Sequence, residues 1–277
     1  MTADGHMTTD GRMTTPTRDE LREHLIRTHI AGAVATPRQG NLRNYRKMAA
    51  RDPDYLFGME LKEWTVEEVL ALMAERCGVN PDPGFFYGDD TIDPDRTIDA
   101  LEAMAARLAL AARHRERVVL ATGHPTGLLP IYLAAGRALR ARGCTVLTPA
   151  AGWAYEVTTP GGARRRQIRY LDGVAMLSGG GSLHHTHDAA PMRAILAELA
   201  AKPKNWPDLA MADHGWAGAA GEAGIDTIGF ADSNDPALFA GEAEGKIAVC
   251  VPLDDNVLPH HYAPLTNYLL SQAGLIP

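Results

Sequence analysis

Five short apolar runs in the C-terminal two-thirds of the chain each end in a cluster of chemically active residues, and this repetition limits the folds open to the sequence. The runs with their clusters are RVVLATGHPTG, VAMLSGGGSLHHTHD, LAMADHGWAG, TIGFADSNDP and AVCVPLDDN. Short apolar strands that alternate with helices are typical of a parallel sheet with helices on both faces. Ligands bind beyond the carboxyl ends of such strands, so we expect the five clusters to meet at one site.

The order of the predicted elements favours an α/β fold with a doubly wound, mainly parallel, Rossmann-like sheet. The pattern predicts about six strands, at residues 117–121, 144–148, 173–177, 208–212, 226–231 and 246–251. Helices are expected between them and at residues 263–273. Residues 153–171 depart from the alternation, and their two β-rich arms around Pro160 predict a hairpin or an insertion.

Three regions follow from the periodicity. Residues 1–17 are rich in Thr and Gly without apolar periodicity, which predicts a disordered tail. Residues 18–116 show helical patterns separated by loops, and we expect them to form an N-terminal helical cap. Residues 117–277 would then form the α/β core domain.

Charge and cysteine usage exclude several classes of partner. The formal net charge is -7, and a net acidic chain repels nucleic acid and anionic lipid, so neither is expected to bind. The chain has 3 cysteines far apart, which read as buried thiols of a reducing compartment. With neither a membrane-spanning stretch nor a secretory pattern, the sequence predicts a cytoplasmic protein. An exposed sheet edge would allow a homodimer.

The loop ATGHPTG lies between a strand and a helix, where backbone N–H groups can hold an anion. Gly123 and Gly127 permit close approach, and Thr122, His124 and Thr126 add side-chain donors. The glycine spacing matches neither a Rossmann fingerprint nor a Walker loop. We expect a phosphate or carboxylate cradle here, the alternative being a tight turn with a structural histidine.

The loop SGGGSLHHTHD combines backbone freedom with imidazole groups. Consecutive glycines, including Gly179 and Gly180, indicate flexibility or a surface that a ligand approaches closely. His184, His185 and His187 supply possible metal ligands, although their spacing matches no common zinc motif. The neighbouring Asp188 has an alternative role as the N-cap of the following helix.

The loops ADHGWAG and ADSNDP place acid–base groups directly after strands. Histidine is the natural general acid or base near neutral pH, and a carboxylate can fix its tautomer, so Asp213 and His214 are candidates. A capping aspartate with a surface histidine is the alternative. In the second loop Asp232 is the freer residue, because Asn234 or Asp235 is expected to cap the next helix.

Two further segments carry charge. The loop PLDDN contains Asp254, Asp255 and Asn256 and could hold a divalent cation or a polyol, or be a solvated turn. Near the N-terminus, Arg38 and Arg43 belong to a mix of Arg and Asn side chains suited to gripping an anionic substrate. A basic helix face in solvent is the other explanation.

The segments VVLATGHPTGLLPIYLAAGRALRARG, MADHGWAGAAGEAGIDTIGFADSNDPAL and VCVPLDDN together resemble a bacterial family of predicted, poorly characterised phosphatases. The resemblance spans about residues 20–265. It implies a phosphate-monoester hydrolase with ATGHPTG and DHG at the active site.

The residues and the resemblance together predict a hydrolase of a small phosphorylated metabolite. We expect His124, Asp213, His214 and Asp232 to be catalytic. Phosphate is expected to bind at Thr122, Gly123, Thr126, Gly127, Gly179, Gly180, Arg38 and Arg43. An activated water is favoured as the nucleophile because the sequence lacks a GxSxG elbow.

A divalent Mg, Mn or Zn ion is a possible cofactor, with Asp213, Asp232 and His187 as candidate ligands, and no nucleotide cofactor is predicted. Two alternative functions stay open. The first is a sugar- or nucleotide-processing isomerase or transferase. The second is a nonenzymatic protein that binds a phosphorylated ligand.

Overall fold

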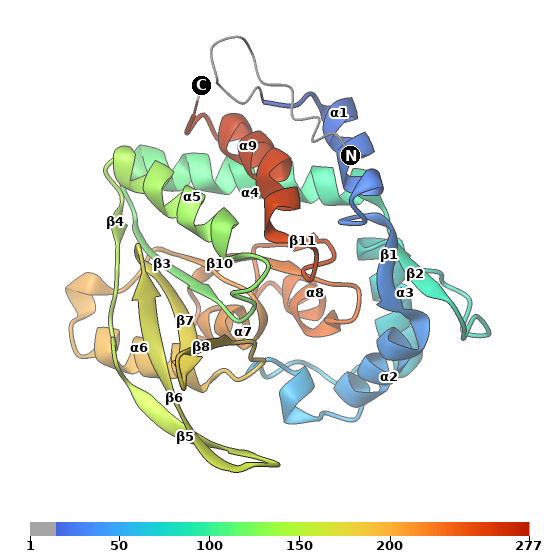
Figure 1. Cartoon of the computed structure of the whole chain (residues 1–277), viewed down its shortest axis with the longest axis horizontal. Helices are drawn as coiled ribbons and strands as arrows, with labels where there is room; N and C mark the ends of the chain where they lie inside the picture. Colours follow the sequence, from blue (N-terminus) through green and yellow to red (C-terminus); the bar gives the residue numbers. More distant parts are fainter. Residues whose placement is uncertain (1–14, 277) are drawn as a thin grey trace.

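A computed structural model describes residues 15–276 and shows the predicted α/β fold. Its large sheet has nine strands, and the main path runs in the order β11-β10-β9-β3-β7-β6-β5 (Figure 1). All six predicted strands are present. They are β3 (Arg117–Thr122), β4 (Thr145–Val146), β7 (Val174–Gly179), β9 (Leu209–Met211), β10 (Asp226–Ala231) and β11 (Val249–Pro252).

The parallel part of the sheet reverses its winding at β3. From this strand the chain proceeds to its neighbour β7 and later returns to β9 on the opposite side, and β10 and β11 continue outward from there. Such a switch point opens a crevice at the carboxyl ends of the strands. The crevice is therefore expected between the loops that follow β3, β7 and β9.

Three antiparallel strands complete the sheet. β5 (Ala154–Thr159) and β6 (Gly162–Leu171) form the predicted hairpin, which extends beyond the rest of the sheet in Figure 1. β6 also pairs with β7, and β8 (Ser182–His184) folds back onto the end of β7. The glycines before β8 form this turn, with Gly180 at a φ of 60°.

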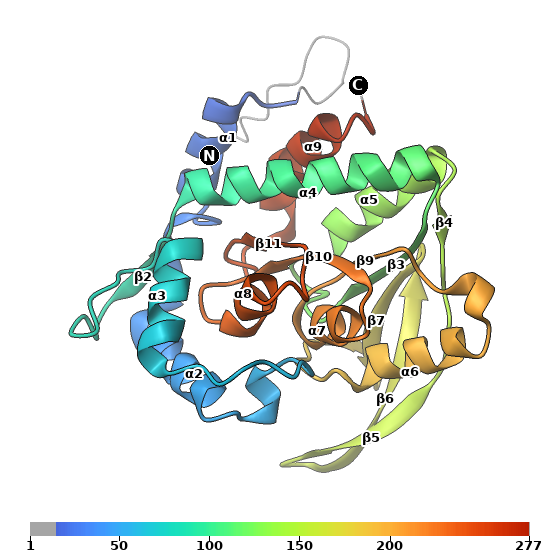
Figure 2. The same ribbon diagram turned by 180° about the vertical axis from the view of Figure 1, so that it is seen from behind.

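Helices cover both faces of the sheet because alternate residues of each buried strand point to opposite sides. Val118 and Leu120 of β3 enter one hydrophobic core, and Val119 and Ala121 enter the other. The first core lies against four helices: α1 (Arg18–Arg27), α4 (Pro94–His114), α5 (Leu129–Ala141) and α9 (Ala263–Gln272). Figure 2 shows α4 running across this side of the molecule.

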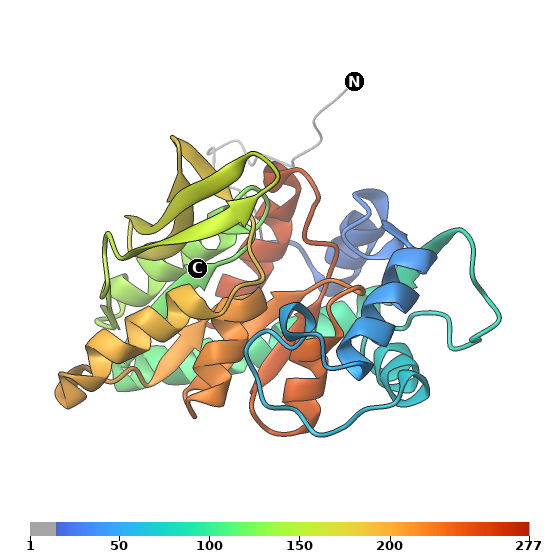
Figure 3. The same ribbon diagram turned by 90° about the horizontal axis from the view of Figure 1, so that it is seen from below.

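The second core lies against the remaining long helices. These are α2 (Arg38–Ala49), α3 (Val66–Arg76), α6 (Ala190–Ala200), α7 (His214–Glu222) and α8 (Pro236–Ala243). Figure 3 shows α6, α7 and α8 side by side on this face of the sheet, with α2 and α3 next to α8. Residues of the 18–116 region thus enter both cores, and its separation as a cap remains a prediction.

The N-terminal region also holds two strands that the sequence pattern did not indicate. β1 (Gly32–Pro37) and β2 (Asp89–Ile92) pair antiparallel in a separate two-stranded sheet. Most of the predicted tail lies outside the described residues, but Thr17 forms a capping box with Glu20 at the start of α1. Among the described residues, no helix combines the length and apolarity needed to cross a membrane.

Candidate active site

A cavity of about 330 Å³ lies at the carboxyl edge of the sheet, and all five predicted loops contribute to its wall. Polar and charged side chains dominate this wall. They come from the end of β1 and from the loops after β3, β8, β9, β10 and β11, namely Thr36, His124, His185, His187, His214, Asp232, Asn234, Asp235, Asp254, Asp255 and Asn256. The expected convergence of the five clusters is therefore present in the structure.

His214 occupies the centre of this arrangement. It begins α7 with a φ of 49°, a left-handed conformation that is strained for a residue with a Cβ atom. The preceding Asp213 stands at the N-cap position but does not cap the helix. Its Oδ1 instead accepts hydrogen bonds from His214 Nδ1 (2.8 Å) and from the backbone N–H of Gly123 (2.6 Å).

The bond to Asp213 fixes which ring nitrogen of His214 faces the cavity. A carboxylate only accepts, so Nδ1 carries the proton and Nε2 points toward the other polar groups. Burial lowers the pKa of His214, but the charges of Asp235 and Asp213 outweigh it and hold this pKa well above its usual value. Burial raises the pKa of Asp213, yet its bond to His214 lowers that pKa overall.

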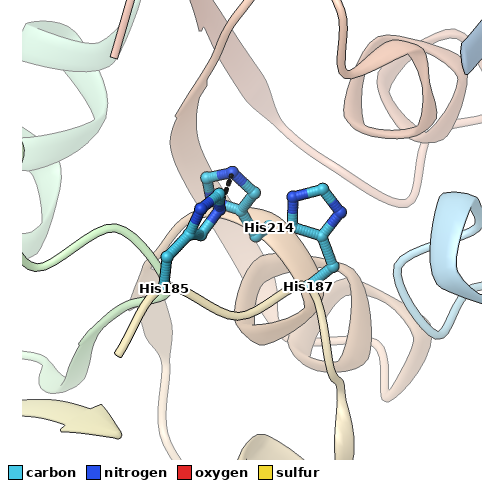
Figure 4. Close-up of side chains that lie close together, drawn as sticks. All are labelled: His185, His187 and His214. Carbon is cyan, nitrogen blue, oxygen red and sulfur yellow. Dashed lines mark hydrogen bonds between the residues drawn. The ribbon is translucent and has the colours of Figure 1, made fainter. Parts of the chain in front are cut away.

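Four potential ligand atoms surround or adjoin His214 Nε2. His185 Nε2 lies at 3.3 Å, Asp235 Oδ2 at 3.3 Å and Asp255 Oδ2 at 3.5 Å. The ring of His187 stacks beside that of His214 at 4.9 Å, and Figure 4 shows the three imidazoles facing one another. The ligand atoms of His185, His187 and His214 are close enough to hold one metal ion, as are those of His214, Asp235 and Asp255.

The two flanking histidines are held in the neutral state that metal coordination requires. Burial, followed by the charge of His214, lowers the pKa of His185 to about 3. Burial also lowers the pKa of His187, which packs edge-on against Phe57 at 5.0 Å. Both imidazoles can therefore present a free nitrogen lone pair near neutral pH.

Asp235 corrects the expectation that its main role is to cap a helix. It does stand at the N-cap position of α8, but its side chain makes no capping bond and turns to His214. Its other oxygen, Oδ1, is buried and has no hydrogen-bond partner in the part of the chain that the structure describes. Burial raises its pKa, and the charge of His214 more than reverses that effect, so Asp235 is ionised. A charged oxygen left unpaired in the interior is expensive and points to an absent ligand.

The carboxylates of Asp232, Asp254 and Asp255 form a further group in the cavity wall. Asp232 accepts hydrogen bonds from Thr36 Oγ1 (2.7 Å) and Asn234 Nδ2 (2.8 Å), and Asp254 accepts one from the N–H of Asn256 (2.9 Å). Burial raises the pKa of Asp255 to about 6 and raises that of Asp254. For Asp232, burial and then repulsion from Asp255 raise the pKa well above its usual range. Asp232, Asp254 and Asp255 form a third group able to hold a metal ion.

The name cavity cluster is used below for the seven potential ligands, His185, His187, His214, Asp232, Asp235, Asp254 and Asp255. Asp213 belongs to none of the three ligand groups, and its Oδ1 contacts His214 Nδ1 instead. The predicted ligands His187 and Asp232 both belong to the cavity cluster.

The ATGHPTG loop contributes the side chain of His124 to the cavity, and the two glycine N–H groups expected to hold an anion are already hydrogen-bonded. His124 lines the cavity, and its buried Nδ1 lacks a hydrogen-bond partner. The N–H groups of Gly123 and Gly127 are already bound, to Asp213 and to the carbonyl of His124. Thr126 is exposed. A Cβ on Gly127 would lie 2.3 Å from the carbonyl oxygen of Asp255, so this glycine lets two loops meet.

None of the eight predicted phosphate-binding residues is among those that line the cavity. Gly179 and Gly180 form the β7–β8 turn, and Arg43 is exposed on α2. Arg38 is fully buried and pairs with Asp90 at 2.8 Å, and Asn41 donates to the same carboxylate oxygen. We call Arg38, Asn41 and Asp90 the Arg38 cluster. Because its guanidinium is occupied, Arg38 is not free to grip a substrate.

Sequence reasoning named His185, Asp254 and Asp255 as possible ligands without including them in the predicted catalytic or metal site, and it missed Thr36. His185, Asp254 and Asp255 were visible as polar residues after strands, which is the signal that finds them. Thr36 carried no such signal, because it comes from a short strand about 200 positions before its partner Asp232.

Comparison with known proteins agrees with this geometry. A protein named Phosphatase SCO2771, from Streptomyces coelicolor (strain ATCC BAA-471 / A3(2) / M145), is 52% identical over 264 residues, which cover 94% of this chain and 98% of that protein. The family described as Phosphatase matches residues 16–277. These matches confirm the resemblance to a bacterial phosphatase family and support a phosphatase. The chain belongs to the Phosphatase family.

Proposed function

We propose that the chain is a metal-dependent phosphate-monoester hydrolase whose active site is the cavity at the carboxyl edge of the sheet. One observation carries the proposal. Four carboxylates line the cavity, and none of its described wall residues is Lys or Arg. A phosphate dianion would be repelled from such a wall unless cations lay between them. A metal ion at the cavity cluster supplies that charge.

The ligands for this ion would be His185, His187, His214, Asp235 and Asp255. Imidazole and carboxylate together suit Zn²⁺ or Mn²⁺. A bound ion of this kind lowers the pKa of a water molecule and shields the charge of the phosphate. Asp213 holds His214 in the tautomer that presents Nε2, as outer-shell carboxylates do for metal-bound histidines.

The reaction needs one further group, and His124 is placed to supply it. The water oxygen forms a bond to phosphorus while the ester P–O bond breaks, giving inorganic phosphate and an alcohol. His124, whose Nδ1 makes no hydrogen bond to the described residues, would protonate the departing alkoxide, and a cavity carboxylate would accept the proton of the water. Direct attack of water on phosphorus requires no nucleophilic side chain, which agrees with the lack of a GxSxG motif in the sequence.

The test is hydrolysis of a panel of small phosphate monoesters by the full chain. Activity should disappear with EDTA and return with Mn²⁺ or Zn²⁺. His214→Asn, chosen because Asn tolerates a positive φ, should lower kcat/KM by about 100-fold or more. His114→Asn, at the exposed end of α4, is the matched control and should leave the rate unchanged. Turnover that survives both chelation and His214→Asn would contradict the proposal.

A further inference from the structure

The three groups of potential ligands are not separate, because they share members. His214 belongs to the first two groups, and Asp255 belongs to the second and third. The first two therefore merge into one position around His214 Nε2. The third group adds Asp232 and Asp254 to Asp255, and neither of these two residues belongs to the first two groups.

The two positions differ in chemistry. The position at His214 offers three imidazoles with Asp235 and Asp255, a set that suits a transition metal. The other position offers only carboxylates, from Asp232, Asp254 and Asp255, and such oxygen ligands suit Mg²⁺ or Mn²⁺. A site that binds a single ion does not need a second set of ligands, made only of carboxylates, beside the first.

Buried atoms without a hydrogen bond lie at and beside Asp255, the carboxylate that the two positions share. Asp255 is 7% exposed, and its Oδ2 makes no hydrogen bond within the described residues. His124 is 5% exposed, and its Nδ1 is likewise unpartnered and lies 4.0 Å from Asp255 Oδ1. Buried polar atoms are normally satisfied, so these two atoms indicate a missing ligand near Asp255.

The carboxylates of the wall also favour more than one divalent ion. Asp232, Asp235, Asp254 and Asp255 would carry four negative charges when ionised, and one divalent cation balances two of them. A phosphate dianion would then add two more. Two divalent cations balance the four carboxylates and leave the substrate attracted to the metal ions.

We propose that the cavity binds two divalent cations, one at His185, His187, His214 and Asp235 and the other at Asp232 and Asp254, with the Asp255 carboxylate shared between them. This inference rests on the proposed function and specifies its metal centre. Two cations held this way can contact the attacking and the leaving oxygen of one phosphoryl group.

The test is Mn²⁺ binding to the full chain after removal of metals, measured by equilibrium dialysis with elemental analysis and by electron paramagnetic resonance. We expect two Mn²⁺ per chain at saturation, with a spectrum broadened by exchange coupling between two neighbouring ions. A single uncoupled Mn²⁺ at saturation would overturn the second position and leave the proposed function standing. A chain that binds no divalent cation would overturn both.

Matched variants separate the two positions. Asp254→Asn should lose one Mn²⁺ and the exchange coupling while the other ion keeps its affinity, because Asp254 belongs only to the carboxylate group. Asp235→Asn should instead weaken the His214 position by about tenfold or more. Asp89→Asn, an exposed aspartate of β2, is the control and should match the unmodified chain. Two coupled ions retained in Asp254→Asn would overturn the proposed ligand set.

Discussion

The Arg38 cluster and the cavity cluster are both buried and polar, yet their charges are balanced very differently. The Arg38 guanidinium donates to Asp90 Oδ2 and to the carbonyl oxygens of Asp82 and Phe85. Asp90 Oδ1 in turn accepts from the N–H groups of Asn80 and Thr91. Positive and negative charge are thus matched within the protein.

The cavity cluster lacks such a match. Its carboxylates crowd one another, and buried oxygens of Asp235 and Asp255 have no hydrogen-bond partner. Burial and mutual repulsion raise the pKa of Asp232 and Asp255. The comparison teaches that burial of polar groups is not itself a sign of function. A balanced cluster stabilises the fold, whereas an unbalanced one marks the place of a ligand that carries the opposite charge.

The largest effect is expected from a substitution that disrupts the Arg38 cluster. Asp90→Asn removes the partner of a fully buried guanidinium, and an unpaired buried charge costs about 3–5 kcal/mol. We expect the free energy of unfolding, measured with urea, to fall by that amount. A loss below about 1 kcal/mol would show that water reaches Arg38 and would remove the contrast between the two clusters.

In the cavity cluster, a substitution is expected to raise the free energy of unfolding when metal is absent. The pKa of Asp255 rises from 3.8 to about 6 on folding, so folded chains keep a proton that unfolded chains release. The free energy of unfolding therefore falls as the pH rises from about 4 to about 6. Asp255→Asn removes this contribution and should stabilise the metal-free chain at pH 7 by up to about 3 kcal/mol.

Unfolding in urea with EDTA, at pH 4 and at pH 7, measures this difference. The variant and the unmodified chain should agree at pH 4 and diverge at pH 7. If the difference in the free energy of unfolding between the two proteins were the same at both pH values, the negative charge of Asp255 would already be compensated by the protein without a cation.

A smaller effect is expected at the residue that orients the cavity cluster. Asp213→Asn keeps the shape of the side chain but no longer favours a proton on His214 Nδ1. Loss of such an outer-shell partner lowers metal affinity or activity by about 10–100-fold. Metal titration and kcat/KM of the variant, with Asp89→Asn as control, check this expectation. An unchanged metal affinity would show that Asp213 does not influence metal binding at the cavity cluster.

The smallest effect concerns how closely two loops of the cavity pack. Gly127→Ala places a Cβ 2.3 Å from the carbonyl oxygen of Asp255, and the loops must separate to accept it. We expect a loss of about 1–2 kcal/mol in the free energy of unfolding. Gly40→Ala in α2, where a Cβ would meet nothing within 4 Å, is the matched control and should be neutral or stabilising.

The sequence predicted the sheet and the loops of the site well, because both depend on local pattern. Apolar runs identify β3, β7, β9, β10 and β11, and parallel winding brings their ends together. β1 and β2 were beyond this reasoning, since they are short and pair across about 50 residues of intervening chain.

Individual roles were harder to predict because one side chain has several local options. Asp235 precedes a proline that begins a helix, and this pattern favours an N-cap. Only the tertiary arrangement shows that it turns to His214 instead. Arg38 was expected to bind phosphate for its charge, but Asp90, which neutralises it, lies 52 positions away in the sequence.

The glycine contacts between the loops restrict how this protein can be redesigned. A Cβ on Gly215 would lie 2.1 Å from the carbonyl oxygen of His187, much as Gly127 fits against Asp255. Each of these contacts joins a glycine to the backbone of a metal-ligand candidate from another segment of the chain. Lengthening or grafting one loop would therefore displace a ligand that a different loop supplies. Diversity libraries aimed at new substrates should hold these glycines, their contact partners and the loop lengths constant and vary the rim of the cavity, beginning at the exposed Asn256.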